Sequence, residues 1–199
     1  MVERGELDRR VGELPELSRP PRLDTPDAAL NRAFAWAVRR DPAGVRADPE
    51  GGLGPWDSDG FAELLELART FRRVGPVGLS DPDCLLHEVV AGLFGARADA
   101  GGGRFELRPW LPEGWRFLIL RRLRCHRTLL DAEVKVRAGW ATVRLELSFG
   151  PPIPLSVELR NVGAVAQVAV DETPLSGDRA IFTLQGQHEV TFFFRGGGQ

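Results

Sequence analysis

The sequence is poor in cysteine and lysine, and it has no long apolar run. Its 199 residues include two cysteines, Cys84 and Cys125, and a single lysine, Lys135. Two cysteines exclude a disulfide framework and show no metal-ligand spacing, so we expect free, mostly buried thiols. No run approaches the roughly 20 apolar residues of a membrane span. The first ten residues lack the apolar core of a signal peptide, so we expect a cytoplasmic protein.

Excess charge of one sign is also absent. The formal net charge is −2, and charged residues make up 27% of the chain. A nearly neutral chain does not bind nucleic acid or an anionic membrane through its net charge, so neither is expected as a partner. Hydrophobic residues make up 43%, which is ordinary for a folded protein.

Three stretches in the first half have the apolar period of an α-helix. The first starts with Thr25 as the N-cap and Pro26 as the first helical residue, and it ends at Arg40. The second runs from Ser58 or Asp59 to Gly75, and the third runs from Asp81-Pro82 to Gly95. Residues 1–24 contain three prolines and predict an irregular arm.

Beyond the glycine triplet at 101–103 the apolar period changes to two, as in half-buried β-strands. Seven or eight short strands separated by Gly, Pro and Asp turns predict an antiparallel β-sandwich. The fold class is therefore α+β, with a helical region at 1–100 and a sandwich domain at 104–195. Three helices with single apolar stripes cannot form a large core alone, so they must cover the sandwich, pair with another chain, or both.

The junction between the two regions carries a family resemblance. It resides in the stretch HEVVAGLFGARADAGGGRFELRPWLPEGW and in the strands that follow it. This stretch resembles the C-terminal region of bacterial (α/α)6-barrel glycoside hydrolases of the α-L-rhamnosidase and glycogen-debranching types. In that family a last barrel helix ends in a Leu-(Phe/Leu)-Gly turn and a strand of the Leu-x-Pro type follows. A Leu-Pro-x-Gly-Trp turn then leads into an antiparallel sandwich. The matching positions are Leu93, Phe94, Gly95, Leu107, Pro109, Leu111, Pro112, Gly114 and Trp115.

Two upstream segments are similar to other parts of such barrels. DAALNRAFAWAV resembles a first barrel helix, and GGLGPWDSDGFAELLELARTF resembles a late barrel loop and helix. A barrel of six helical hairpins needs far more residues than this chain has, so the barrel is largely missing. The family's catalytic acid and base lie in that missing part, and no residue here matches a catalytic motif.

The tryptophans of LRPWLPEGW have two interpretations. Trp110 and Trp115 can fill the contact between helices and sheet, because large aromatic side chains supply buried area. They can also stack on a sugar, which makes them candidate substrate-binding residues. The resemblance favours the first interpretation.

The loop DPEGGLGPWDSDG offers the best candidates for chemistry. Glu50, Asp57 and Asp59 are candidate catalytic carboxylates, and Trp56 is a candidate sugar-binding residue. Glycoside hydrolysis needs two carboxylates about 5–5.5 Å apart for retention or about 6.5–9.5 Å apart for inversion. Asp and Gly are also common in any solvated loop, and Asp59 is explained as a helix cap.

The histidines and arginines give weaker signals. His87, His126 and His188 are scattered, and no nucleophile elbow, zinc motif or phosphate loop is present, so neither a metal nor a cofactor is expected. Five arginines lie on the first long strands, where they can bind an anion or pair with acidic residues of neighbouring strands. These are Arg116, Arg121, Arg122, Arg124 and Arg127.

The function that the sequence favours is a non-catalytic relative of glycoside hydrolases with a structural or weakly carbohydrate-binding role. One alternative is a minimal glycoside hydrolase that uses the 48–59 loop on oligosaccharides. Another is a protein-interaction module that docks through its helices. The corresponding partners are an oligosaccharide, a second copy of the chain, or a barrel-containing protein.

Overall fold

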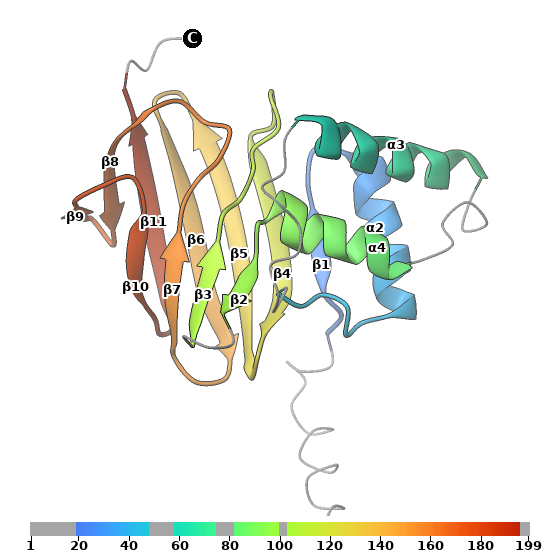
Figure 1. Cartoon of the computed structure of the whole chain (residues 1–199), viewed down its shortest axis with the longest axis horizontal. Coiled ribbons are helices and arrows are strands. Elements are labelled where there is room, and N and C mark those ends of the chain that lie inside the picture. The colour runs from blue at the N-terminus through green and yellow to red at the C-terminus, as the bar shows by residue number, and fades with distance from the viewer. Residues whose placement is uncertain (1–18, 48–57, 75–81, 100–102, 196–199) are drawn as a thin grey trace, which may run out of the picture.

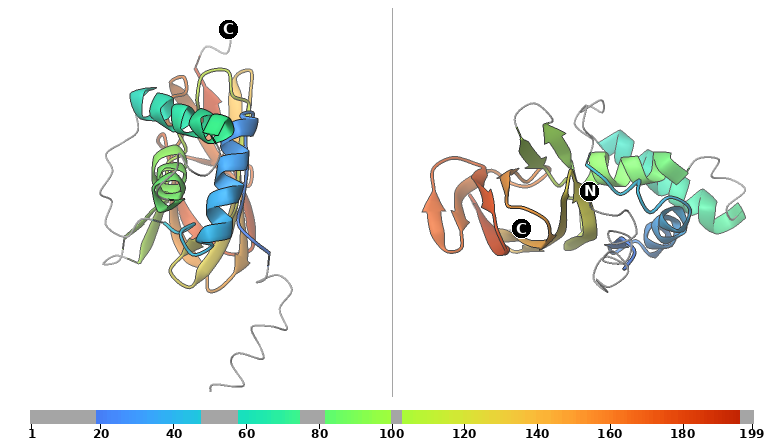
Figure 2. Two further views of the ribbon diagram at one scale, coloured as in Figure 1. Left: turned by 90° about the vertical axis from the view of Figure 1, so that its right-hand side faces the viewer. Right: turned by 90° about the horizontal axis from the view of Figure 1, so that it is seen from below.

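The computed structural model describes residues 19–47, 58–74, 82–99 and 103–195. These residues form three helical stretches beside a sandwich of two β-sheets (Figure 1). The predicted α+β fold class is confirmed. The helices lie together at one side of the sandwich, as the end-on view in Figure 2 shows.

Helix α2 (Ala28–Arg40) begins two residues later than predicted. The carboxylate of Asp27 accepts hydrogen bonds from two backbone N–H groups of the first turn, each at 2.8 Å. Asp27 is therefore the N-cap. The prediction of Thr25 as the N-cap is wrong, because its hydroxyl instead donates to Oδ1 of Asn31 at 2.9 Å.

The second predicted helix is confirmed as α3 (Ser58–Val74). The third consists of the α-helix α4 (Pro82–His87) and a π-helical continuation, η2 (Glu88–Leu93). The wider π turn is evident where the N–H of Phe94 donates to the carbonyl of Val89 at 3.0 Å. Gly95 follows with a φ of 56°, a left-handed conformation that suits glycine at the end of a helix.

The large sheet has seven strands in the order β1-β4-β5-β6-β11-β8-β9. They are β1 (Arg22–Asp24), β4 (Phe117–Cys125), β5 (Thr128–Arg137), β6 (Trp140–Phe149), β11 (Gln187–Phe194), β8 (Val165–Val170) and β9 (Thr173–Leu175). Strand β1 pairs with β4. The prediction of an irregular arm up to residue 24 is therefore wrong at its end, where a strand of three residues is too short to show a period.

The small sheet has four strands in the order β10-β7-β3-β2. They are β10 (Ala180–Leu184), β7 (Ile153–Val157), β3 (Arg104–Leu107) and β2 (Arg97–Asp99). Strands β3 and β7 pair in parallel, whereas the named strand pairs of the large sheet are antiparallel. Strand β2 precedes the glycine triplet, so the chain joins the sandwich before the triplet.

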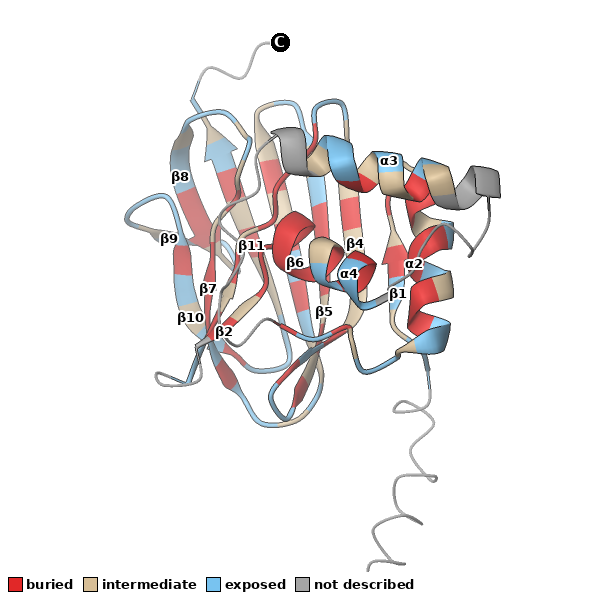
Figure 3. Cartoon of the chain, turned by 45° about the vertical axis from the view of Figure 1, so that its right-hand side comes forward, coloured by how far each residue is buried: buried red, intermediate tan, exposed pale blue. Residues whose placement is uncertain are grey.

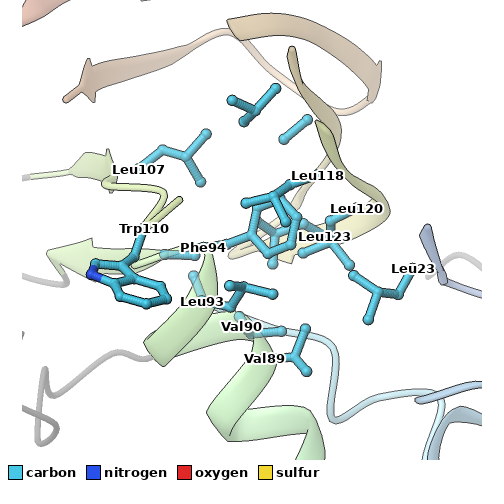
Figure 4. Close-up of a cluster of buried hydrophobic side chains, with 14 of the residues drawn as sticks. Leu23, Val89, Val90, Leu93, Phe94, Leu107, Trp110, Leu118, Leu120 and Leu123 are labelled. Carbon is cyan, nitrogen blue, oxygen red and sulfur yellow. The ribbon is translucent and has the colours of Figure 1, made fainter. Parts of the chain in front are cut away.

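One core runs through the sandwich and the helices. Buried residues alternate with exposed ones along the long strands (Figure 3). Beyond the small sheet, the inner side of β1 and β4 packs against η2. Figure 4 shows Leu23, Leu118 and Leu120 of the sheet beside Val90 and Phe94 of the helical segment, all of them buried. The apolar side of η2 is therefore covered by the sandwich of the same chain, whereas α2 packs against α3, α4 and β1.

The two thiols differ in exposure. Cys84 is exposed, whereas Cys125 is buried. The expectation of a buried thiol is thus wrong for Cys84, which lies on the outer side of the short helix α4. Burial raises the pKa of Cys125 to about 12, so its thiol stays protonated at neutral pH. Among the residues that the structure describes, no helix has the length and apolar character of a membrane span.

Candidate functional site

The Pro-Trp motif lies in an extended connecting segment, residues 107–111, between the end of η2 and the end of β7. On one side, the N–H of Trp110 donates to the carbonyl of Leu93 at 2.8 Å, and the N–H of Arg108 donates to that of Phe94 at 3.1 Å. The last carbonyls of a helix have no partner within the helix and need donors from elsewhere. The connecting segment supplies them.

The other side of the connecting segment accepts hydrogen bonds. The carbonyl of Leu107 accepts from the N–H of Glu158 at 3.1 Å, and that of Pro109 accepts from the N–H of Arg160 at 2.9 Å. The amide of Asn161 donates to the carbonyl of Leu111 at 2.6 Å. The segment therefore ties the end of the helix to the chain that follows β7.

The side chain of Arg160 reinforces the same contact. Its guanidinium donates to the carbonyls of Arg108 at 2.8 Å and Gly92 at 3.1 Å. Burial lowers the pKa of Arg160 to about 10, with a further contribution from the positive charges of Arg108 and Arg97. The group remains charged at neutral pH, and a cation is favourable at the negative end of a helix.

The aromatic residues of this region pack on one another. The Phe61 ring of α3 lies 5.0 Å from that of Trp110 and 5.3 Å from that of Trp115, with an edge-on arrangement in the second pair. Trp110 is only 8% exposed. These distances are typical of favourable aromatic pairs. The two tryptophans therefore hold α3 against the sandwich, and we name this contact together with the connecting segment the seam.

The remaining candidates from the 48–59 loop are only partly described. Glu50, Trp56 and Asp57 lie outside the described residues, and Asp59 is in the first turn of α3. The site expected in the 48–59 loop therefore stays a prediction. Among the described residues, no group of three His, Cys, Asp or Glu side chains is placed to hold a metal ion.

One histidine has a partner that the sequence did not reveal. Nδ1 of His188 lies 2.6 Å from a carboxylate oxygen of Asp171. The backbone N–H of Glu189 donates to Asp171, which together with His188 keeps the pKa of that carboxyl below its ordinary value. The pair ties the β8–β9 turn to β11.

The predicted pairing of strand arginines with acidic neighbours is confirmed for Arg121. Its guanidinium lies 3.5 Å from a carboxylate oxygen of Asp131 and 2.9 Å from one of Glu133. Lys135 also pairs with Glu133. The hydrogen bond from Lys135, followed by the charges of Lys135 and Arg121, lowers the pKa of Glu133 although burial opposes the shift.

A second surface, which the sequence did not single out, lies on the outer face of the large sheet. Arg137, Trp140, Phe193 and Gln167 are successive cross-strand partners on β5, β6, β11 and β8. Their neighbours along the strands, such as Phe192, point into the core. The four side chains therefore form a row on the opposite face, which we name the aromatic row.

The aromatic row is open to solvent. Phe193 is 41% exposed, and Trp140 is partly exposed with the guanidinium carbon of Arg137 5.3 Å from its ring centre. Large aromatic residues out of phase with the buried positions are the signal that could have indicated this face. Their proximity, however, depends on the pairing of β6 with β11, which the sequence does not reveal.

Comparison with known proteins gives weak matches only. No protein-family model matches the sequence. No curated protein matches it either. The solved structures that are similar to the chain include two glycoside hydrolases.

The α-L-rhamnosidase from Dictyoglumus thermophilum is 10% identical, with a TM-score of 0.42, over 56% of this chain and 13% of the enzyme. The GH127 β-L-arabinofuranosidase from Geobacillus stearothermophilus T6 is 9% identical, with a TM-score of 0.38, over 85% of this chain and 28% of the enzyme. The chain thus matches less than a third of the length of either enzyme.

Proposed function

We propose that this chain is a non-catalytic relative of glycoside hydrolases with a structural role. The observation that supports the proposal is the seam. The end of η2 is bonded to the connecting segment, and the connecting segment is bonded to residues 158–161. The helices and the sandwich therefore act as one supporting unit, and Trp110 and Trp115 both pack on Phe61 of α3.

Loss of the seam tests the structural part of this proposal. In Phe61→Ala, both aromatic contacts with Trp110 and Trp115 are lost, at an expected cost of about 2–4 kcal/mol in the free energy of unfolding. Urea unfolding followed by tryptophan fluorescence measures it. Phe149→Ala is the matched control, because Phe149 is 47% exposed and should change stability little. Equal stabilities of the two variants would contradict a supporting role for the seam.

Assays with aryl rhamnosides, arabinofuranosides and glucosides test the non-catalytic part. We expect the full chain to release no more product than its Glu50→Gln/Asp57→Asn double variant. Hydrolysis by the wild-type chain that this double variant abolishes would instead establish the minimal hydrolase that uses the 48–59 loop. Such a result would leave the packing role of the seam intact.

A further inference from the structure

We propose that the aromatic row on the outer face of the large sheet binds an acidic oligosaccharide, one whose sugars carry carboxylates. This surface is separate from the seam, so the proposal does not depend on the structural role proposed above. The described helices lie at the β1–β4 side of the sandwich, away from the late strands β8, β9 and β11 (Figure 2).

The apolar part of the row is suited to stacking. Trp140 and Phe193 are direct partners on neighbouring antiparallel strands, which lie about 4.8 Å apart. A partly exposed tryptophan and an exposed phenylalanine at that spacing form a continuous apolar strip. The faces of aromatic rings carry a partial negative charge that favours the weakly positive C–H groups of a sugar ring. A strip of this kind accommodates the C–H face of a sugar.

The polar part of the row provides groups for sugar hydroxyls. Gln167 extends the row on β8, and the next row along the strands contains Thr142 and Thr191 as direct partners. Hydroxyl and amide groups both donate and accept hydrogen bonds. The strip is thus bordered by neutral groups that match an alcohol-rich ligand.

The charge at this position favours an anion. Among the described residues Arg137 is in no ion pair, and its guanidinium stacks on Trp140. Further along the same face the charges are neutralised within the sheet, since Arg144 pairs with Glu189 at 3.3 Å and Lys135 pairs with Glu133. Arg137 is therefore the cation available for a carboxylate beside the aromatic strip.

The size of the strip argues against a second copy of the chain as the occupant. A stable protein interface buries about 800 Å² on each partner, and two aromatic side chains supply only a part of that area. A short oligosaccharide matches the strip better, because one sugar ring covers about one aromatic side chain. Single-stranded nucleic acid also stacks on aromatic rings and binds cations, so it is included in the test.

The test is a titration of the full chain with tetragalacturonate, followed by tryptophan fluorescence and calorimetry. We expect saturable binding that becomes about tenfold or more weaker in Trp140→Ala and in Phe193→Ala, since each removes one stacking partner. Arg137→Gln should weaken binding of tetragalacturonate but not of neutral cellotetraose. The matched controls Phe149→Ala and Arg127→Gln alter an exposed phenylalanine and an exposed arginine elsewhere, and they should bind normally.

Several outcomes would overturn the proposal. One is that a chain with an intact melting transition does not bind tetragalacturonate at concentrations up to millimolar. Another is that the control variants lose as much affinity for tetragalacturonate as the variants of the aromatic row. Equal affinity for cellotetraose, unaffected by Arg137→Gln, would refute the acidic ligand. Binding of oligo(dT) with the same pattern of losses, and none of tetragalacturonate, would replace the oligosaccharide by single-stranded DNA.

Discussion

Arg160 donates a hydrogen bond to the carbonyl oxygen of Gly92, which precedes it by 68 residues. The bond joins the chain after β7 to the last turn of η2. It also places a buried cation where the helix dipole is negative. The contact is not local in sequence, and neither residue belongs to a recognisable motif. It nevertheless couples the helical half of the molecule directly to the sandwich.

Replacement of Arg160 is therefore expected to destabilise the protein. Arg160→Met keeps much of the side-chain volume but leaves the carbonyls of Gly92 and Arg108 without this donor. We expect the free energy of unfolding to fall by about 2–4 kcal/mol, since each bond from a charged donor contributes roughly 1.5–3 kcal/mol. Urea denaturation measures the change. Arg144→Met, which breaks an exposed ion pair with Glu189, should cost less than about 1 kcal/mol. The reverse order would argue against the coupling role of Arg160.

Two glycines with positive φ provide a test of how closely Gly95, after the end of η2, approaches the backbone of Arg108 in the connecting segment. A Cβ at Gly95 (φ 56°) would lie 2.4 Å from the backbone oxygen of Arg108, whereas a Cβ at Gly114 (φ 77°) would meet nothing within 4 Å. Gly114→Ala should cost about 1–2 kcal/mol from backbone strain alone. Gly95→Ala should cost about 1–3 kcal/mol more, because the connecting segment must move. Melting temperatures of the two variants measure the difference, and equal values would mean that the segment yields without cost.

In the β8–β9 turn, substitutions by glycine at two adjacent positions should change the free energy of unfolding in opposite directions. Asp171 and Glu172 both have positive φ, 47° and 68°, a conformation that glycine adopts more easily. Glu172→Gly should raise the free energy of unfolding by about 0.5 kcal/mol through relief of strain. Asp171→Gly should lower it by about 1 kcal/mol, because the bonds from His188 and Glu189 are lost. Differential scanning calorimetry distinguishes the two signs, and stabilisation by both substitutions would show that the carboxylate of Asp171 is dispensable.

Stability should depend on pH through Glu133. Its pKa in the folded protein lies below the ordinary value of 4.5, so the folded state favours the ionised carboxylate. The corresponding stabilisation is fully present above pH 4.5 and is lost as the pH falls through the lower folded-state pKa. The stability gap between wild type and Glu133→Gln should therefore be constant near neutral pH and shrink in acid. Urea unfolding at several pH values measures it; a gap that widens in acid would be the wrong sign.

Period and turn residues were sufficient for much of the fold. The span of α3, the end of the third helix at Gly95 and the alternation along β5 and β6 followed from local pattern. The strand β1 did not, because three residues show no period and its pairing with β4 is made across about a hundred residues. The N-cap was misplaced because Thr25 and Asp27 are both good capping residues.

The candidate functional surfaces were harder to predict because they too depend on contacts between residues that are far apart in the sequence. Trp110 and Trp115 were recognised as packing candidates, but their partner Phe61 is far away in sequence. Trp140 and Phe193 are ordinary strand residues until the pairing of β6 with β11 makes them neighbours. Contacts of this kind depend on which strands pair and in which register. The register is fixed by the packing of the whole sheet and is not visible in the sequence of one strand.

The parallel pairing of β3 with β7 sets an order for folding during synthesis. The helices and β3 leave the ribosome first, but residues 158–161, which bond to the connecting segment, emerge about fifty residues after it. Contacts between distant parts of a chain form slowly because a long loop must close first. Until the chain after β7 has been made, the connecting segment lacks its hydrogen bonds to residues 158–161. The end of η2 then also lacks the bond from Arg160 to Gly92. A nascent chain stopped before residue 150 should therefore remain sensitive to protease in its helical half and gain resistance once β7 has been made.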